Sequence, residues 1–101
     1  MSKFNELING NIPVLLDIYA NWCGPCKVLS PIIKEIKSDF NDSLVILKID
    51  VDKNTAISDK FQVKGVPTLI LFKSGKIIWR QSGLLTKKEL KAILQEKIKK
   101  N

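Results

Sequence analysis

The chain has 101 residues, of which 45% are hydrophobic and 27% charged, and this balance fits one folded domain with a single core. It excludes a disordered chain and disfavours two domains. The net charge is +7, but every cation except Arg80 is a lysine, and the lysines are scattered among acids. A solvated basic surface is therefore favoured over a nucleic-acid site, which would use more arginine.

No apolar run approaches the roughly 20 residues of a membrane span, and the first residues lack the apolar stretch of a secretory signal. We therefore expect a cytoplasmic protein, with neither a membrane nor a nucleic acid among its partners.

Apolar spacing predicts the elements of the first half of the chain. Residues 4–8 have the spacing of a short helix. Residues 14–20 form a near-continuous apolar run, which is typical of a parallel strand covered on both faces. From Cys23 to Phe40 the period becomes that of an amphipathic helix, in which Pro31 predicts a kink. A second apolar run follows at residues 44–51.

The second half begins with a short predicted helix at residues 54–61, with Asn54 as its cap. Its inward-facing residues are expected to be Ala56, Ile57 and Phe61. Residues 68–72 and 77–81 predict two antiparallel strands joined by a hairpin loop.

The last predicted helix spans residues 86–98, and Thr86 and Glu89 fit a capping box at its start. The order of all the elements predicts an α/β fold, in which a mixed central sheet of four strands is flanked by helices on both faces.

Two cysteines and no histidine restrict the chemistry. A closed zinc site within one chain needs four ligands, covalent haem attachment needs a histidine after the second cysteine, and Ser-His or Cys-His catalysis needs a histidine. We therefore expect no bound metal or cofactor. A metal shared by two copies of the chain is the one alternative left open.

The two cysteines lie in the motif Trp22–Lys27, between a buried strand and an amphipathic helix. At positions i and i+3 they can open and close a disulfide with little backbone movement. Cys23, at the helix N-terminus, faces unpaired N–H groups that favour a thiolate, so we expect it to be the nucleophile. Cys26 is expected to be less exposed and to resolve a mixed disulfide. A static disulfide is the less favoured interpretation.

The motif, with Asp17 six residues before Cys23 and with Gly65-Val66-Pro67-Thr68 and Gly83 after it, resembles the thioredoxin family over nearly the whole chain. This resemblance implies a single thioredoxin domain over residues 1–101, without the family's usual first strand. It also implies a monomeric thiol-disulfide oxidoreductase that reduces protein disulfides. The donor would be a thioredoxin reductase that uses NADPH.

Further site residues follow from the same resemblance. Asp17 would be a buried proton acceptor for Cys26, with Lys48 as its neighbour. The simpler alternative is an Asp at a strand edge that reaches water or accepts a hydrogen bond from a backbone N–H. Pro67 would be cis and would pack against the disulfide, while Val66 presents its backbone to an extended substrate segment. The substrate-binding rim would comprise Trp22, Gly24, Pro25, Gly65, Val66 and Gly83.

Two other functions stay open at this point. Within redox chemistry, the chain could serve one dedicated partner, or act as an oxidant or isomerase. From a different class, it could be a non-catalytic binding subunit that uses the apolar rim.

Overall fold

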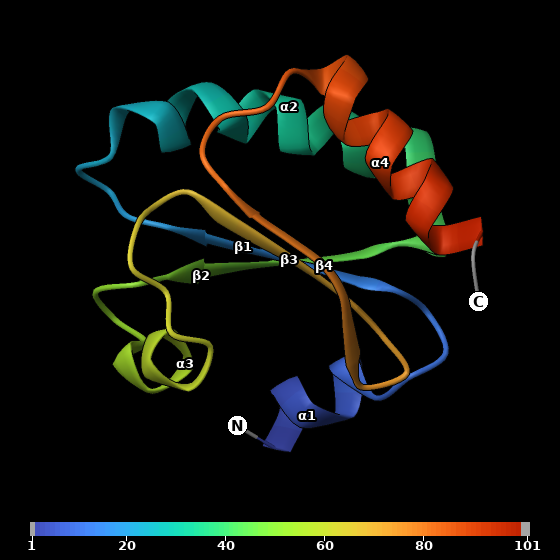
Figure 1. The fold of residues 1–101 in the computed structure, drawn as a ribbon, viewed down its shortest axis with the longest axis horizontal. Coiled ribbons are helices and arrows are strands. Elements are labelled where there is room, and N and C mark those ends of the chain that lie inside the picture. Colours follow the sequence, from blue (N-terminus) through green and yellow to red (C-terminus); the bar gives the residue numbers. More distant parts are fainter. Residues whose placement is uncertain (1, 100–101) are drawn as a thin grey trace.

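The computed structural model describes residues 2–99, which form a four-stranded sheet between two layers of helices (Figure 1). The elements in chain order are α1 (Ser2–Ile8), β1 (Val14–Tyr19), α2 (Gly24–Phe40), the 3-10 turn η1 (Asn41–Ser43), β2 (Val45–Asp50), α3 (Thr55–Lys60), β3 (Thr68–Lys73), β4 (Lys76–Ser82) and α4 (Lys87–Lys99). The predicted order of helices and strands is therefore confirmed.

The sheet has the strand order β2-β1-β3-β4. The β1–β2 pair is parallel, whereas β3 is antiparallel to both β1 and β4. The α2 and α4 helices cover one face of the sheet, and α1 and α3 cover the other (Figure 1). The mixed four-stranded sheet is thus confirmed, and within the described residues no fifth strand pairs with the outer edge of β2.

Two hydrophobic cores hold the layers together, one on each face of the sheet. Leu15, Leu69 and Leu71 face α2 and α4, where they pack against residues such as Ile36 and Leu90. Because successive side chains of a strand alternate between faces, the neighbours of these residues fill the other core. Burial on both faces explains why β1 and β3 are almost continuously apolar.

The second core contains a cluster of three aromatic rings, Phe4, Phe61 and Phe72. Their centroids lie 5.4 to 6.1 Å apart in edge-to-face arrangements. Ile57 of α3 is buried in this core, as expected, but Ala56 is exposed. The prediction for Ala56 is wrong because α3 is shorter than two helical turns, and Ile57 is the only one of its described residues that is buried.

The ends of the helices confirm one predicted cap and correct another. At α4 the Thr86 Oγ1 accepts a hydrogen bond from the Glu89 N–H (3.1 Å), and the Glu89 carboxylate accepts one from the Thr86 N–H (3.0 Å). These bonds hold the pKa of Glu89 below its usual value. Asn54 stands at the N-cap of α3, but its amide donates to the Asp50 carbonyl (3.1 Å) instead of capping the helix. Pro31 lies inside α2, and the kink expected there stays a prediction.

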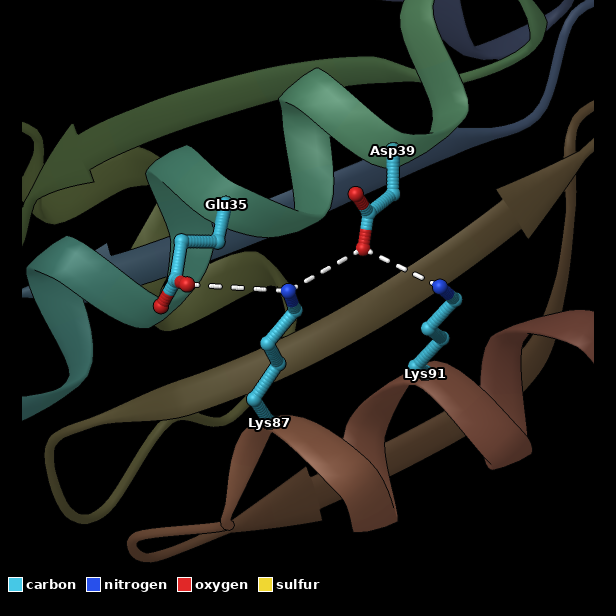
Figure 2. A network of polar contacts seen from close by, with 4 residues as sticks. All are labelled: Glu35, Asp39, Lys87 and Lys91. Carbon is cyan, nitrogen blue, oxygen red and sulfur yellow. Dashed lines mark ion pairs between the residues drawn. The ribbon is translucent and has the colours of Figure 1, made fainter.

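An ion-pair network joins the two helices on one face of the sheet (Figure 2). The Asp39 carboxylate of α2 lies 3.3 Å from the Lys87 ammonium and 3.2 Å from the Lys91 ammonium, both on α4. Lys87 also approaches Glu35 at 3.6 Å. Hydrogen bonds from Lys91 and Lys87 hold the pKa of Asp39 below its usual value, so Asp39 is the centre of the network.

We expect Asp39→Asn to lower the free energy of unfolding slightly at neutral pH and low salt. The loss should shrink in high salt, because screening already weakens the exposed pairs in the wild type. It should also shrink as the pH falls, because a carboxylate with a depressed pKa stabilises the fold only while it is ionised. Urea unfolding at two salt concentrations and two pH values measures both effects. Asp59→Asn, which removes an exposed carboxylate outside the network, is the control, and an equal loss in both variants would contradict the assignment.

Candidate active site

The cysteine pair lies where the chain leaves β1 and starts α2. Cys23 is the N-cap of the helix, and its Sγ accepts a hydrogen bond from the Cys26 N–H at 3.1 Å. A disulfide joins Cys23 to Cys26, whose Cα atoms are 5.3 Å apart. Pro25 lies in the first turn, where its missing N–H costs no helical bond. The predicted position of Cys23 at the helix N-terminus is confirmed.

The expected difference in exposure between the two cysteines is wrong for this disulfide form. Cys23 is 3% exposed and Cys26 is 7% exposed. Both belong to a small buried cluster that packs against Val51 and Val66, and this contact covers the pair as a whole. Cys26 additionally lines a pocket, so it keeps slightly more contact with solvent. The position at the helix terminus, and not exposure, is what distinguishes Cys23.

Asp17 lies in the middle of β1, and its side chain is 3% exposed. Burial raises the pKa of this carboxyl to about 6, while the nearby positive charge of Lys48 opposes the shift. The carboxyl and Cys26 line the same pocket of about 310 Å³. The other lining residues are Tyr19, Ala20, Asn21, Lys27, Ser30 and Lys48. A pocket of this size can hold water.

Lys48 is the residue of β2 that pairs directly with Asp17 of β1, which confirms that the two are neighbours. Its ammonium donates a hydrogen bond to the Ser30 Oγ at 3.2 Å and lies 5.2 Å from the centre of the Tyr19 ring. The ion pairs found among residues 2–99 do not include Asp17 with Lys48. Lys48 therefore acts on Asp17 through its charge at a distance.

A second segment of the site is the turn that contains Pro67, in which Val66 packs against the cysteine pair. The Val66-Pro67 bond is cis, as predicted, and Pro67 is buried. The Thr68 hydroxyl bonds to the Gly65 carbonyl at 2.6 Å, and the Gly83 N–H donates to the Pro67 carbonyl at 2.9 Å. Gly83 has a φ of 101°, which glycine adopts without strain. These bonds hold the turn before β3 and the end of β4 together.

Trp22 completes the rim of the site. Its side chain is 70% exposed, and its Nε1 donates a hydrogen bond to the Asp52 carboxylate at 2.9 Å. The two residues share a pocket of about 250 Å³ with the segment from Val63 to Val66. Sequence reasoning missed Asp52 as a partner of Trp22. The available signal was an acidic residue two positions after the end of β2, at the edge of the sheet where Cys23 also lies.

The structure thus brings the cysteine pair, Trp22 and the turn before Pro67 to one edge of the sheet, where Gly24, Pro25 and Gly65 are exposed. Asp17 and Lys48 pair farther back, within β1 and β2. Within residues 2–99, no group of three or more His, Cys, Asp or Glu side chains could hold a metal ion. None of the helices in that range has the length and apolar character needed to cross a membrane.

Comparison with known proteins agrees with this geometry. The thioredoxin family model matches residues 1–96. The chain is 39% identical to thioredoxin of Mycoplasmoides gallisepticum over 93% of each chain, and 39% identical to thioredoxin of Haemophilus influenzae over 91% of this chain and 86% of that one. A mutant thioredoxin from Halobacterium salinarum has the same fold, with a TM-score of 0.88 at 33% identity over 98% of this chain and 86% of that chain.

The chain belongs to the thioredoxin family. It is a thiol-disulfide oxidoreductase that reduces disulfides in protein substrates. Its redox group is the Cys23–Cys26 pair itself, because thioredoxins carry no prosthetic group. The family and the cysteine pair at disulfide distance do not favour the alternative of a non-catalytic binding subunit.

We expect Asp17→Asn to raise the free energy of unfolding of the oxidised protein at pH 7.5. A carboxyl whose pKa is about 6 when folded and 3.8 when unfolded destabilises the fold once it must ionise. The gain should be about 3 kcal/mol above pH 6 and should fade as the pH drops toward 4. Denaturant unfolding at pH 7.5 and pH 4 measures it, with Asp59→Asn as the exposed control. An equal gain at both pH values would show that ionisation is not the cause.

Proposed function

We propose that Cys23 carries out the first chemical step of protein-disulfide reduction. In the reduced protein its thiolate attacks one sulfur of the substrate disulfide. A bond forms between Cys23 and that sulfur, the substrate S–S bond breaks, and the leaving thiolate takes up a proton. The observation that carries this proposal is the hydrogen bond from the Cys26 N–H to the Cys23 Sγ at the N-cap of α2. Such a donor, together with the helix dipole, stabilises negative charge on sulfur.

Cys26 carries out the second step, and Asp17 is its proton acceptor. The Cys26 thiol passes its proton through the shared pocket to the carboxylate, and the new thiolate attacks the Cys23 sulfur. A Cys23–Cys26 bond forms and the Cys23–substrate bond breaks. The leaving thiolate takes up a proton, so the substrate departs as a dithiol, and two electrons have passed to it from the cysteine pair. Burial, which raises the pKa of Asp17 to about 6, supports this role because the carboxylate is then basic enough to accept a proton near neutral pH. The positive charge of Lys48 limits the shift.

The substrate binds as an extended segment along the turn before Pro67. Val66 would offer its backbone groups for a short antiparallel pairing, and buried Pro67 would support that turn from below. The contact surface comprises Trp22, Gly24, Pro25, Gly65, Val66 and Gly83. The exposed Trp22 ring and the small residues around the disulfide support this assignment, because they leave room for a partner's backbone.

We extend the proposal to the oligomeric state, the electron donor and the compartment of the protein. We propose that the 101 residues form a single domain that acts as a monomer. A radius of gyration of 12.7 Å supports one domain of this length. A thioredoxin reductase that uses NADPH would restore the dithiol, since each turnover leaves the pair oxidised. We place the protein in the cytoplasm, a compartment in which thiols are kept reduced.

We expect Cys23→Ser to abolish the reduction of insulin by dithiothreitol-recharged protein, because no nucleophile remains at the helix N-cap. Cys26→Ser is the matched variant, and it should trap a stable mixed disulfide between Cys23 and the substrate. Mass spectrometry of the alkylated mixture detects the trapped complex. Activity that survives in Cys23→Ser would overturn the mechanism.

We expect Asp17→Asn to slow the second step while leaving the first unchanged. At pH 7 the resolution of the mixed disulfide should fall by roughly tenfold or more, at the lower side of what a positioned acid-base group contributes. In the wild type, the rate of this step should depend on a group that titrates near pH 6, and in Asp17→Asn this dependence should be absent. Rapid-quench kinetics from pH 5 to 8 separates the two steps. An unchanged pH profile would remove Asp17 from the mechanism.

A further inference from the structure

The position of the Lys48 ammonium is not the one that its place in the sheet would suggest. Lys48 and Asp17 are direct partners across the β1–β2 pair, and opposite charges at such positions attract each other. The lysine side chain is long enough to reach its neighbour. Its ammonium instead bonds to the Ser30 Oγ on α2 at 3.2 Å and lies 5.2 Å from the centre of the Tyr19 ring.

Both anchors are well placed to hold a cation. Tyr19 is two residues beyond Asp17 on β1, so its side chain points to the same face of the sheet. The face of an aromatic ring attracts a cation within about 6 Å. The Ser30 hydroxyl adds a hydrogen bond from the helix above. The side chains of Asp17, Tyr19, Ser30 and Lys48 all line the same 310 Å³ pocket.

The other groups near Asp17 are further candidate influences on the pKa of its carboxyl, but Lys48 is the charge that acts on it. On β3 the partner of Asp17 is the apolar Leu69. From α2, Lys27 and Cys26 line the pocket. Asp50 on β2 accepts hydrogen bonds from the Asn21 amide and the Asp52 N–H.

We propose that Ser30 and Tyr19 are positioning residues, which hold the Lys48 ammonium off the Asp17 carboxylate and thereby tune the proton acceptor of Cys26. This inference rests on the proposed role of Asp17 in the second step. The attraction between two charges grows as their distance shrinks, so an ammonium that left Ser30 for Asp17 would favour the ionised carboxylate. Asp17 would then be a weaker base at neutral pH.

The test is a direct titration of the Asp17 carboxyl by ¹³C NMR in the oxidised protein, which needs no measurement of activity. The wild-type midpoint is expected near pH 6. Ser30→Ala should lower this midpoint by roughly half a pH unit or more, because Lys48 is then free to approach. Ser30→Thr, which keeps the hydroxyl, should restore the wild-type value.

A double-mutant cycle shows whether Ser30 acts through Lys48. In a Lys48→Met background, Ser30→Ala should leave the midpoint unchanged, whereas in the control background Lys27→Met it should keep its full effect. An unchanged midpoint in Ser30→Ala, or an equal shift with and without Lys48, would overturn the inference. Tyr19→Leu should lower the midpoint as well, and that shift should likewise shrink when Lys48 is replaced.

The kinetic consequence separates this inference from the proposed function. In Ser30→Ala the pH profile of mixed-disulfide resolution should move down with the carboxyl midpoint, while attack by Cys23 keeps its rate. A midpoint that moves while the profile stays fixed would remove Asp17 from the second step and leave the positioning of Lys48 standing. A profile that vanishes in Asp17→Asn, with neither the profile nor the carboxyl midpoint moved in Ser30→Ala, would remove only the positioning role.

Discussion

The whole site depends on one hydrogen bond, from the Cys26 N–H to the Cys23 Sγ at the first turn of α2. That bond exists because α2 begins after a short loop, residues 20–23, that leaves β1 at the carboxyl edge of the sheet. The parallel β2 ends at the same edge, and the antiparallel β3 starts there. This topology alone brings Cys23, Asp52 and Pro67 together, although they are far apart in the chain. The helix supplies the charge stabilisation, and the sheet supplies its neighbours.

The buried carboxylate of Asp17 lowers the stability of the same fold when it ionises. Asp17 lies in a strand whose other side chains are apolar and buried, except for the half-buried Tyr19 at its end. Its ionisation costs stability at neutral pH, and the two cores on either side of the sheet offset that cost. A destabilising group that is held in a pocket with a reactive sulfur is typical of a site in which stability has been exchanged for activity.

Regular periodicity made the fold and the cysteine pair predictable. The strands and helices follow from apolar spacing, and the capping box at Thr86 is a local pattern. The errors have a different origin. The side chain of Asn54 makes no capping bond, and its amide Nδ2 instead donates to a carbonyl of the preceding strand, a contact that the capping pattern does not report. The exposure of Cys23 depends on Val51 and Val66, which approach from other elements. The bonds of Lys48 to Ser30 and of Trp22 to Asp52 join residues 18 and 30 positions apart, and no spacing rule reports such contacts.

The choice of lysine over arginine at position 48 fits this arrangement. A guanidinium presents a rigid fork of donors that matches a carboxylate, so an arginine beside Asp17 would bind it with two parallel hydrogen bonds and keep it ionised. An ammonium is a compact charge on a flexible stem, and one hydroxyl with one aromatic face is enough to hold it. Lysine therefore supplies a positive charge to the pocket that moderates the acid without capturing it. Under the proposed role of Asp17, that distinction leaves the carboxyl buried and still able to exchange a proton with Cys26.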